Sequence, residues 1–271
     1  MLARIPRDSV RPAIIGVSCL AGLYLTYKAM SFIKSFYQKS LVKPLDFIQR
    51  YGAKSWVVIT EGSTDFGKNW AEKFASAGFN IILIDKSPIP ADFKAKIEKN
   101  YKVKLVTIDE NLADEESVKK VLELFNNQAY DISIVIVNSK EVELGRFKSI
   151  KNDEGIIEPG AFKEMESENI TNVIQTNLIV PALFIRGLAL RLFGRDKRSA
   201  VILCTAEFSG KFPYSAAYNA VKGYRSALGL SLQEELKEKI DVLVVNASGY
   251  DEVATVNQSY RHLGRRVEPP I

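Results

Sequence analysis

Tyr218 and Lys222 are the two residues whose types and spacing best suit a chemical step. They stand four positions apart in the run Tyr-Asn-Ala-Val-Lys, within a helix expected over 214–237. Residues i and i+4 share one face of a helix, so the lysine ammonium can lower the pKa of the tyrosine hydroxyl. Such a phenol is a usable proton donor to a carbonyl oxygen. The pair is common in sequences, so its place in the fold has to support the assignment.

A turn rich in small and polar residues is the second candidate for chemistry. It spans Gly62–Gly67, between a β-branched run at 56–60 and a segment with helical spacing that contains Trp70 and Phe74. A helix N-terminus that follows such a turn offers N–H groups and a favourable dipole to a phosphate. The sequence therefore predicts a dinucleotide site in which Gly62 and Gly67 let the backbone approach the ligand.

Two carboxylates in or beside this turn oppose that prediction. Glu61 precedes Gly62, and Asp65 lies inside the turn. Like charges within about 4–6 Å cost on the order of 1 kcal/mol or more, even when partly screened. We therefore expect no bound cofactor, with NAD or NADP(H) as the cofactor if the site works.

The elements around these residues alternate between strands and helices. Short apolar runs predict strands at 56–60, 81–84, 104–108, 132–137, 200–204 and 240–246. Helices are expected between them, including one long segment at 162–193 that is interrupted at Pro181. Buried strands joined by helical crossovers indicate an α/β fold, a Rossmann-like doubly wound parallel sheet of about six strands.

With these motifs in place, the sequence resembles the short-chain dehydrogenase/reductase family from about Pro44 to Thr255. Within it, the chain is similar to the membrane-anchored branch of very-long-chain 3-oxoacyl-CoA reductases and 17β-hydroxysteroid dehydrogenases. The resemblance implies a catalytic set in which Tyr218 and Lys222 are joined by Asn177 and Thr205. In the family's turn, Thr-Gly-x-x-x-Gly-x-Gly, Glu61 and Asp65 replace the first two glycines, unless a one-residue slip lets Gly62 serve as the first.

The resemblance also implies three further cofactor-binding positions. Asp85 would read the adenosine ribose and favour NAD over NADP, although it equally suits a surface loop. Asp109 would contact adenine, and it equally suits a turn after a strand. Asn138 alone remains of an Asn-Asn-Ala-Gly motif, because the residues at 139–141 are Ser-Lys-Glu.

Composition excludes several classes of function. The chain has 271 residues, 46% of them hydrophobic, and a formal net charge of +5. Two cysteines and one histidine argue against a disulfide framework and against a metal site. No basic face with interleaved aromatic residues indicates nucleic-acid binding.

The N-terminal region predicts a single membrane anchor. A basic segment precedes apolar stretches at 13–27 and 29–33, together about the 20 residues that a span requires. A cleaved signal peptide and an amphipathic surface helix are the alternatives. The predicted organisation is a basic segment and anchor at 1–36, a linker at 37–54, the reductase-like domain at 55–255 and a basic tail at 256–271.

The sequence is compatible with two main functions and one weaker possibility. The acidic turn, the changed motif at 139–141 and the expected lack of a substrate-covering segment after Thr255 favour a catalytically inactive scaffold. We expect that scaffold to be an accessory subunit of a membrane complex, with other subunits and the lipid bilayer as partners and the mitochondrial inner membrane, in a respiratory assembly, as the preferred address. The alternative is an active NAD(P)-dependent 3-oxoacyl-CoA or steroid-type carbonyl reductase in the endoplasmic reticulum membrane. A nucleotide-binding structural subunit is a third, weaker possibility.

Overall fold

The chain divides into two units, Met1–Leu45 and Asp46–Ile271. The computed structural model describes residues 20–33, 46–138, 162, 166–205 and 216–246, without the side chain of Tyr218. In the first unit, residues 20–33 form a helix with exposed apolar side chains, including Leu23, Tyr27 and Phe32. The basic tail and the rest of the predicted anchor lie outside the described residues.

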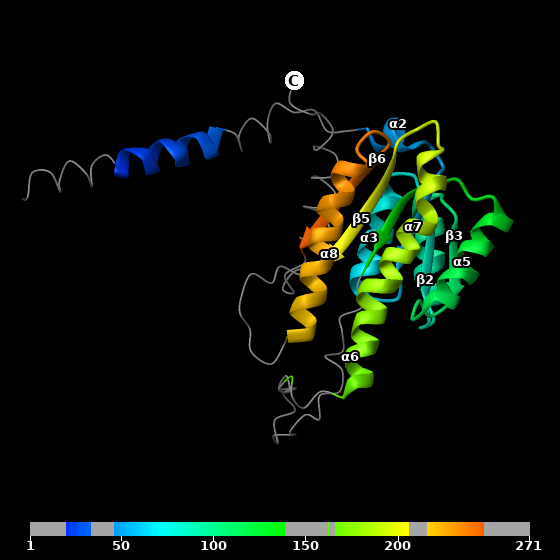
Figure 1. The fold of residues 1–271 in the computed structure, drawn as a ribbon. Helices are drawn as coiled ribbons and strands as arrows, with labels where there is room; N and C mark the ends of the chain where they lie inside the picture. Colours follow the sequence, from blue (N-terminus) through cyan, green and yellow to red (C-terminus); the bar gives the residue numbers. More distant parts are fainter. Residues whose placement is uncertain (1–19, 34–45, 139–161, 163–165, 206–215, 247–271) are drawn as a thin grey trace, which may run out of the picture. The chain divides into compact units, whose positions relative to one another are not determined.

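A six-stranded parallel sheet forms the centre of the second unit (Figure 1). Its order is β3-β2-β1-β4-β5-β6, which confirms the predicted doubly wound architecture. The strands lie within one residue of their expected bounds: β1 Trp56–Thr60, β2 Asn80–Asp85, β3 Leu105–Asp109, β4 Ile132–Val137, β5 Ser199–Thr205 and β6 Ile240–Asn246. Strands β2 and β3 follow β1 on one side and β4 to β6 lie on its other side, so the strand order reverses between β1 and β4. The carboxyl ends of these two strands flank the switch point at which doubly wound sheets bind ligands.

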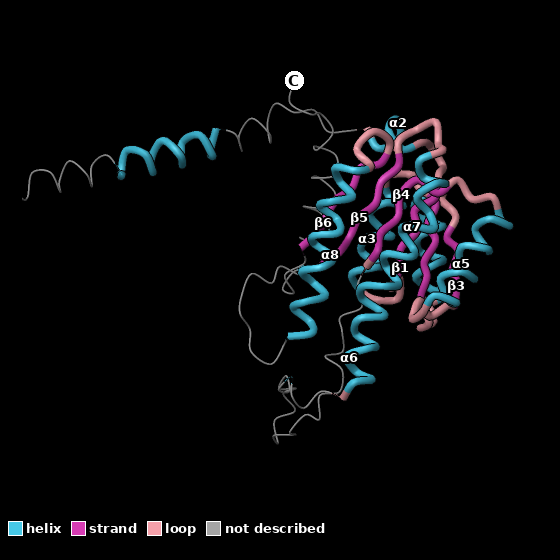
Figure 2. The backbone as a smooth tube through the Cα atoms, viewed as in Figure 1, coloured by secondary structure: helices cyan, strands magenta, loops and turns pink. Residues whose placement is uncertain are grey.

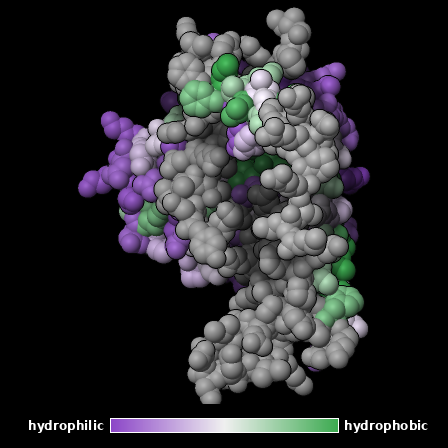
Figure 3. All heavy atoms as spheres, turned by 90° about the vertical axis from the view of Figure 1, so that its left-hand side faces the viewer, coloured by the Kyte–Doolittle hydropathy of each residue, from purple (hydrophilic) through white to green (hydrophobic). Residues whose placement is uncertain are grey.

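The helices cover both faces of the sheet (Figure 2). Right-handed crossovers place α3 and α4 on one face and α5, α7 and α8 on the other. The helices are α2 Phe47–Tyr51, α3 Asp65–Ser76, α4 Ala91–Tyr101, α5 Glu115–Gln128, α6 Ser167–Ile174, α7 Val180–Phe193 and α8 Ala216–Glu235. The described surface in Figure 3 is largely hydrophilic, with hydrophobic side chains in small groups.

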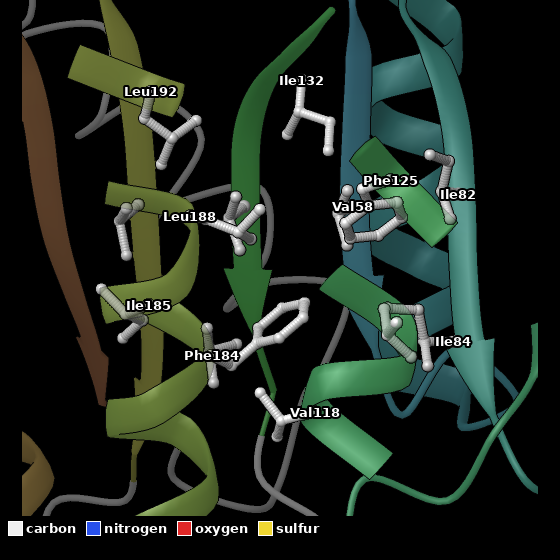
Figure 4. Close-up of a cluster of buried hydrophobic side chains, with 14 of the residues drawn as sticks. Val58, Ile82, Ile84, Val118, Phe125, Ile132, Phe184, Ile185, Leu188 and Leu192 are labelled. Carbon is white, nitrogen blue, oxygen red and sulfur yellow. The ribbon is translucent and has the colours of Figure 1, made fainter. Parts of the chain in front are cut away.

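The core on the α5 and α7 face consists of alternate strand residues packed against two amphipathic helices (Figure 4). Val58 and Ile82 point from the sheet toward Phe125 of α5, while Phe184 and Leu188 project from α7. All five side chains are at most 1% exposed. Each such side chain contributes about 1.5–3 kcal/mol by leaving water, so this layer fixes the strands whose ends form the site.

The expected long helix is continuous, and its irregular turn precedes Pro181. Between α6 and α7, residues Gln175–Ile179 form a π-helical turn, η2. Pro181 itself fits near the start of α7, where its missing N–H costs little. The expected interruption at Pro181 is therefore wrong by a few residues.

This helix, Ser167–Phe193, is also the one described helix long and apolar enough to cross a membrane by length and composition. Its inner side packs on the sheet and on α5. The predicted anchor at 13–33 does not meet the same test within the described residues, because only 20–33 of it are described.

A network of ion pairs and hydrogen bonds lies at the amino ends of β5 and β6. Asp241, the second residue of β6, accepts hydrogen bonds from Arg50 Nε and Nη2 at 2.7 and 2.8 Å. Tyr51 Oη and two nitrogens of Arg198 also donate to it. Burial raises the pKa of Asp241, but the hydrogen bonds from Arg50 and Arg198 outweigh that effect and hold it below its usual range. The network therefore ties α2 to β6.

Candidate functional site

Lys222 and Thr205 meet where β5 ends against α8. The hydroxyl of Thr205, the last residue of β5, donates to the main-chain oxygen of Lys222 at 3.2 Å. The side chain of Lys222 is buried, with 3% of its residue surface exposed. The first turns of α8 are therefore anchored to the carboxyl edge of the sheet. Tyr218 lies on this helix one turn before Lys222, and its phenol lies outside the described residues.

Asn177 occupies the irregular turn that packs against α8. Its side chain is 4% exposed, and Nδ2 donates to the oxygen of Val173 at 3.2 Å and to Thr176 Oγ1 at 3.0 Å. The residue sits at the centre of η2, and single π-helical turns are frequent at functional sites. The structure thus places Asn177 on η2, Thr205 on β5 and Lys222 on α8, and α8 contacts both of the other elements.

The turn predicted to bind a dinucleotide has a glutamate in a strained backbone conformation. Glu61 has φ +54°, the left-handed conformation that a glycine adopts most easily. Its main-chain oxygen accepts hydrogen bonds from the Thr64 hydroxyl at 2.8 Å and from Thr64 N at 3.3 Å. Gly62 has no positive φ, so the left-handed position of the turn falls on Glu61.

The two remaining glycines permit close approach of the backbone. A Cβ on Gly67 would lie 2.5 Å from the main-chain oxygen of Glu61, and one on Gly62 would lie 2.7 Å from Cβ of Leu83. The first contact packs the N-terminus of α3 against the turn, and the second packs the turn against β2. Thr64 caps that helix, because its hydroxyl accepts from Gly67 N at 3.0 Å.

Asp65, one of the two acids expected to oppose a phosphate, lies in the first turn of α3. Its side chain is 86% exposed, and it forms an ion pair of 3.4 Å with Lys68. An acid at this position stabilises a helix through the dipole. The charge of Asp65 is therefore solvated and paired at the helix surface.

Asp85 and Asn138 hold the turn in place from neighbouring strands. Asp85 Oδ2 accepts from both N and Oγ of Ser63, at 3.0 and 2.7 Å, while its Oδ1 accepts from Ser87 N at 3.0 Å. Asn138 N donates to Thr60 Oγ1 at 2.9 Å. Asp109 is exposed beside Asp85 at the end of β3.

Arg225 is a charged residue of this region that the sequence analysis missed. It lies three residues after Lys222 on α8, is fully buried, and donates through Nη2 to the oxygen of Val137 at 2.9 Å. Burial lowers its pKa to about 10. Arg225 and Lys222 are three residues apart, so they share one face of the helix. This spacing could have indicated from the sequence that Arg225 also faces inward.

The local field at the carboxyl edge is positive around Cys204, the residue before Thr205. Burial raises the pKa of this thiol to about 12, while the charges of Arg225 and Lys222 act in the opposite direction. The two buried cations Lys222 and Arg225 therefore lie near the carboxyl ends of β4 and β5. Among the described residues, no group of histidine, cysteine and acidic side chains could hold a metal ion.

Comparison with known proteins identifies relatives of this arrangement. A sequence profile described as short chain dehydrogenase matches residues 55–262. The very-long-chain 3-oxoacyl-CoA reductase of Candida albicans is 27% identical over 245 residues, which cover 88% of this chain and 67% of that protein. The protein of the same name from Neurospora crassa is 26% identical, covering 83% and 65%. The chain thus spans about two thirds of the length of these curated relatives.

Solved structures share the fold at lower identity. A bulky-bulky ketone specific alcohol dehydrogenase from Comamonas testosteroni superposes with a TM-score of 0.63 at 19% identity, covering 78% of this chain and 84% of that one. A short-chain dehydrogenase from Sphingobium yanoikuyae in complex with NADPH gives 0.60 at 20% identity, covering 75% and 82%.

Proposed function

The chain belongs to the short-chain dehydrogenase family, and from that premise we propose that it is a nicotinamide-dependent carbonyl reductase that acts on long acyl chains at a membrane. The observation that supports this most strongly is Lys222, a buried lysine held at the carboxyl end of β5 on the helix that carries Tyr218. Burying an ammonium is costly, so its place at the switch-point edge of the sheet suits a role in chemistry better than one in packing.

In the proposed reaction, Tyr218 donates its phenolic proton to the carbonyl oxygen of the substrate. Lys222 stabilises the phenolate that remains, because an ammonium one helical turn away favours the anion. The nicotinamide, when bound, supplies the hydride that reduces the carbonyl carbon to an alcohol carbon. Asn177 would hold a water that returns the proton to Tyr218, and Thr205 would orient the carbonyl from the end of β5.

The residues present fit a dinucleotide at the turn. Gly67 lets the N-terminus of α3 pack closely on the turn, since a Cβ there would lie 2.5 Å from the main-chain oxygen of Glu61. A helix N-terminus at this position favours a phosphate through its dipole. Lys222 and Arg225 supply buried positive charge. Asp65, exposed and paired with Lys68, opposes a phosphate less than the sequence alone suggests, because solvent screens its charge.

We further propose NADP(H) as the preferred cofactor. Both oxygens of Asp85 already accept hydrogen bonds from Ser63 and Ser87. This carboxylate therefore stabilises the turn and is less available to bind a ribose hydroxyl. Lys86 follows it at an exposed position. A cation there favours a ribose 2′-phosphate. The expected result is a lower Kd for NADPH than for NADH.

The substrate class and the membrane are proposals that rest on the relatives and on the first unit. The curated relatives are named very-long-chain 3-oxoacyl-CoA reductases, so a 3-oxoacyl thioester is the substrate to test first. The exposed apolar side chains of residues 20–33 suit a bilayer anchor. Cell fractionation would choose between the endoplasmic reticulum expected from the branch and the mitochondrial membrane expected from the basic N-terminus.

A scaffold without turnover, such as an accessory subunit of a membrane complex, is the second candidate. The observation that favours it is Glu61, because a carboxylate stands where the family has a glycine. Under this proposal the fold would be kept for its surface and no dinucleotide would bind.

Binding and turnover separate the two candidates. The purified full chain in mild detergent is titrated with NADPH while tryptophan fluorescence is followed, and reduction of a long-chain 3-oxoacyl-CoA is then measured. We expect saturable binding and a loss of about 10²–10⁴-fold in kcat for Tyr218→Phe, the range for a removed general acid. Tyr224→Phe, on the same helix and 39% exposed, is the matched control and should keep its activity. Absence of NADPH binding would leave the scaffold as the function.

A further inference from the structure

The amino ends of the strands form a cationic end of the second unit. Six short segments lead from the helices into the strands, at 52–55, 77–79, 102–104, 129–131, 194–198 and 236–239. Together they hold eight lysines and arginines and three acids. The segments that are described in full after the strands, at 61–64, 86–90 and 110–114, hold three acids and one lysine. The described loops are therefore positive at the amino ends of the sheet and negative at its carboxyl ends.

Nearby acids neutralise only part of this positive charge. Arg195 pairs with Asp131 at 2.7 Å, and Arg198 pairs with Asp241 at 2.8 Å. Other cations of these segments are fully exposed and have no ion pair within the described chain, and we call them the basic surface: Lys54, Lys102, Lys104 and Lys197. Their charge is thus available to a partner outside the domain.

The segments that carry the basic surface are fixed to one another. Asn80, the first residue of β2, donates through Nδ2 to the oxygen of Lys54 at 2.6 Å, and its Oδ1 accepts from N of Lys104 at 2.9 Å. Lys197 Nζ donates to the oxygen of Gln49 in α2 at 3.0 Å. The lysines precede β1, β3 and β5 in the order β3-β2-β1-β4-β5, and neighbouring strands lie about 4.8 Å apart. The basic surface therefore extends about 20 Å across the end of the sheet.

The backbone at two of these positions does not favour a lysine. Lys54 and Lys102 have φ of +58° and +56°, the left-handed conformation that glycine adopts most easily. Lys102 ends α4, where glycine is the usual residue. Because a smaller residue would suit the local backbone better, the presence of two lysines fits a role for their charge at the surface.

The course of the chain favours a lipid bilayer as the partner of the basic surface. Asp46 is the first residue of the second unit and the N-cap of α2. Helix α2 lies at the same end of the sheet, where Arg50 bonds to Asp241 near the start of β6. The unit that precedes Asp46 holds the helix at 20–33 with its exposed apolar side chains, proposed above as a bilayer anchor. The cationic end of the domain is therefore the end that follows the anchor in the chain.

We propose that the basic surface binds the anionic headgroups of the membrane that holds the anchor. Each lysine near an anionic lipid surface multiplies the equilibrium constant for binding by about five. In this orientation the carboxyl ends of the strands, with the candidate site, face away from the bilayer toward a water-soluble dinucleotide. The proposal rests on the membrane anchor in the proposed function and does not depend on reductase activity.

Energy transfer from tryptophan to labelled lipid headgroups tests the proposal. The full chain is reconstituted in phosphatidylcholine vesicles that carry a trace of dansyl-labelled headgroups, with and without phosphatidylserine. Both tryptophans, Trp56 and Trp70, lie in the second unit, and Trp56 begins β1 at the amino end of the sheet. We expect more transfer when phosphatidylserine is present at low salt. The gain should disappear at about 0.5 M salt, where the Debye length falls to about 4 Å.

Two matched triple variants separate the basic surface from the net charge of the chain. The test variant combines Lys54→Gln, Lys104→Gln and Lys197→Gln, and it should lower the equilibrium constant for docking about 10²-fold. The control loses the same charge at exposed lysines of α4 and α5, through Lys96→Gln, Lys119→Gln and Lys120→Gln. It should keep the gain in transfer. All six side chains are exposed, so unfolding by urea should change little in either variant.

The outcomes distinguish this proposal from the proposed function. Equal transfer with and without phosphatidylserine, or an equal loss in both triple variants, would overturn docking on lipid and leave an acidic protein as the partner to seek. Release of the wild-type chain from the vesicles at high salt would support binding by charge and reject the anchor. Docking by a chain that binds no NADPH would retain the basic surface and reject the reductase.

Discussion

The amino ends of the strands (the amino edge) and their carboxyl ends (the carboxyl edge) each hold a charged side chain largely out of water. The hydrogen bonding of that side chain differs between the two. At the amino edge, the Asp241 carboxylate accepts hydrogen bonds from the side chains of Arg50, Tyr51 and Arg198. Both of its oxygens therefore have hydrogen-bond partners. At the carboxyl edge, Arg225 has one recorded hydrogen bond and two unpartnered nitrogens among the described residues. Fully satisfied networks stabilise a fold, whereas unsatisfied buried groups concentrate where a protein binds or reacts.

The backbone does not by itself separate the two ends. A glutamate takes a left-handed conformation at the carboxyl edge, inside the turn between β1 and α3, and Lys54 does so just before β1, at the amino edge. Lys102 and Ala129 adopt a similar conformation as C-caps of helices. The contrast between the two ends therefore rests on side chains: Asp241 is fully hydrogen-bonded, whereas Arg225 has nitrogens without a partner in the described part of the chain.

The largest effect expected from this comparison is loss of stability at the amino edge. Asp241→Asn removes the charge that holds Arg50 and Arg198 while keeping the shape of the side chain. We expect the free energy of unfolding to fall by about 3 kcal/mol, because two partly buried guanidinium groups lose their anion. Urea unfolding of the full chain in detergent measures it. Glu234→Gln, which breaks an exposed pair with Lys237, is the control and should change little. A loss below about 1 kcal/mol for Asp241→Asn would remove the distinction between the edges.

Gly67→Ala tests the packing of the carboxyl edge. The new Cβ would meet the Glu61 oxygen at 2.5 Å and Cα of Gly62 at 3.0 Å, and neither is a side-chain atom that can swing away. We expect a loss of about 2 kcal/mol from this overpacking, measured by the same unfolding assay. Gly223→Ala on α8, where nothing lies within 4 Å of the added Cβ, is the matched control and should be neutral or stabilising. Equal tolerance of both substitutions would mean that the turn is looser than described.

Much of the architecture was predictable from the sequence because strands and helices carry periodic signals. Buried parallel strands read as continuous apolar runs, so β1, β4 and β6 begin and end where expected. The irregular turn at 175–179 was not predictable, because Pro181 pointed to the wrong position and proline is well tolerated at the start of a helix.

The residues of the candidate site could be named from the sequence, but their electrostatics could not. The family resemblance pointed to Asn177 and Thr205 beside Lys222, and the structure places them on η2 and β5, both of which contact the helix α8 that carries Lys222. The expectation that Asp65 opposes a phosphate was made on sequence position alone, which does not show that its side chain is 86% exposed. Arg225 lies far from Val137 in sequence, so its burial against the end of β4 follows only from tertiary structure.

The dependence of the unfolding free energy on acidic pH gives a smaller effect, and it tests the charge of Asp241 specifically. Hydrogen bonds from Arg50 and Arg198 hold the pKa of Asp241 below its usual range despite burial. Its contribution to stability is therefore fully present above the unfolded-state pKa of about 4 and is lost as the pH falls through the lower folded-state pKa. We expect the gap in unfolding free energy between wild type and Asp241→Asn to be constant from pH 7 to 5 and to narrow by about 1 kcal/mol as the pH approaches 3. A gap that does not change with pH would show that Asp241 acts through shape and not through charge.

The smallest expected effect is that of Asp65→Asn, which compares two acids at the carboxyl edge. Asp65 is exposed and paired with Lys68 at the start of α3, whereas Glu61 is half-buried in the turn itself. Removing the Asp65 charge should lower stability by no more than about 0.5 kcal/mol, since an exposed first-turn acid gains little from the helix dipole. Because water and salt screen its charge from the turn, Kd for NADPH should change by less than about twofold at 0.15 M salt. An improvement of tenfold or more would mean that Asp65 acts directly on the phosphate, and the acidic turn would then oppose the cofactor from the helix as well as from Glu61.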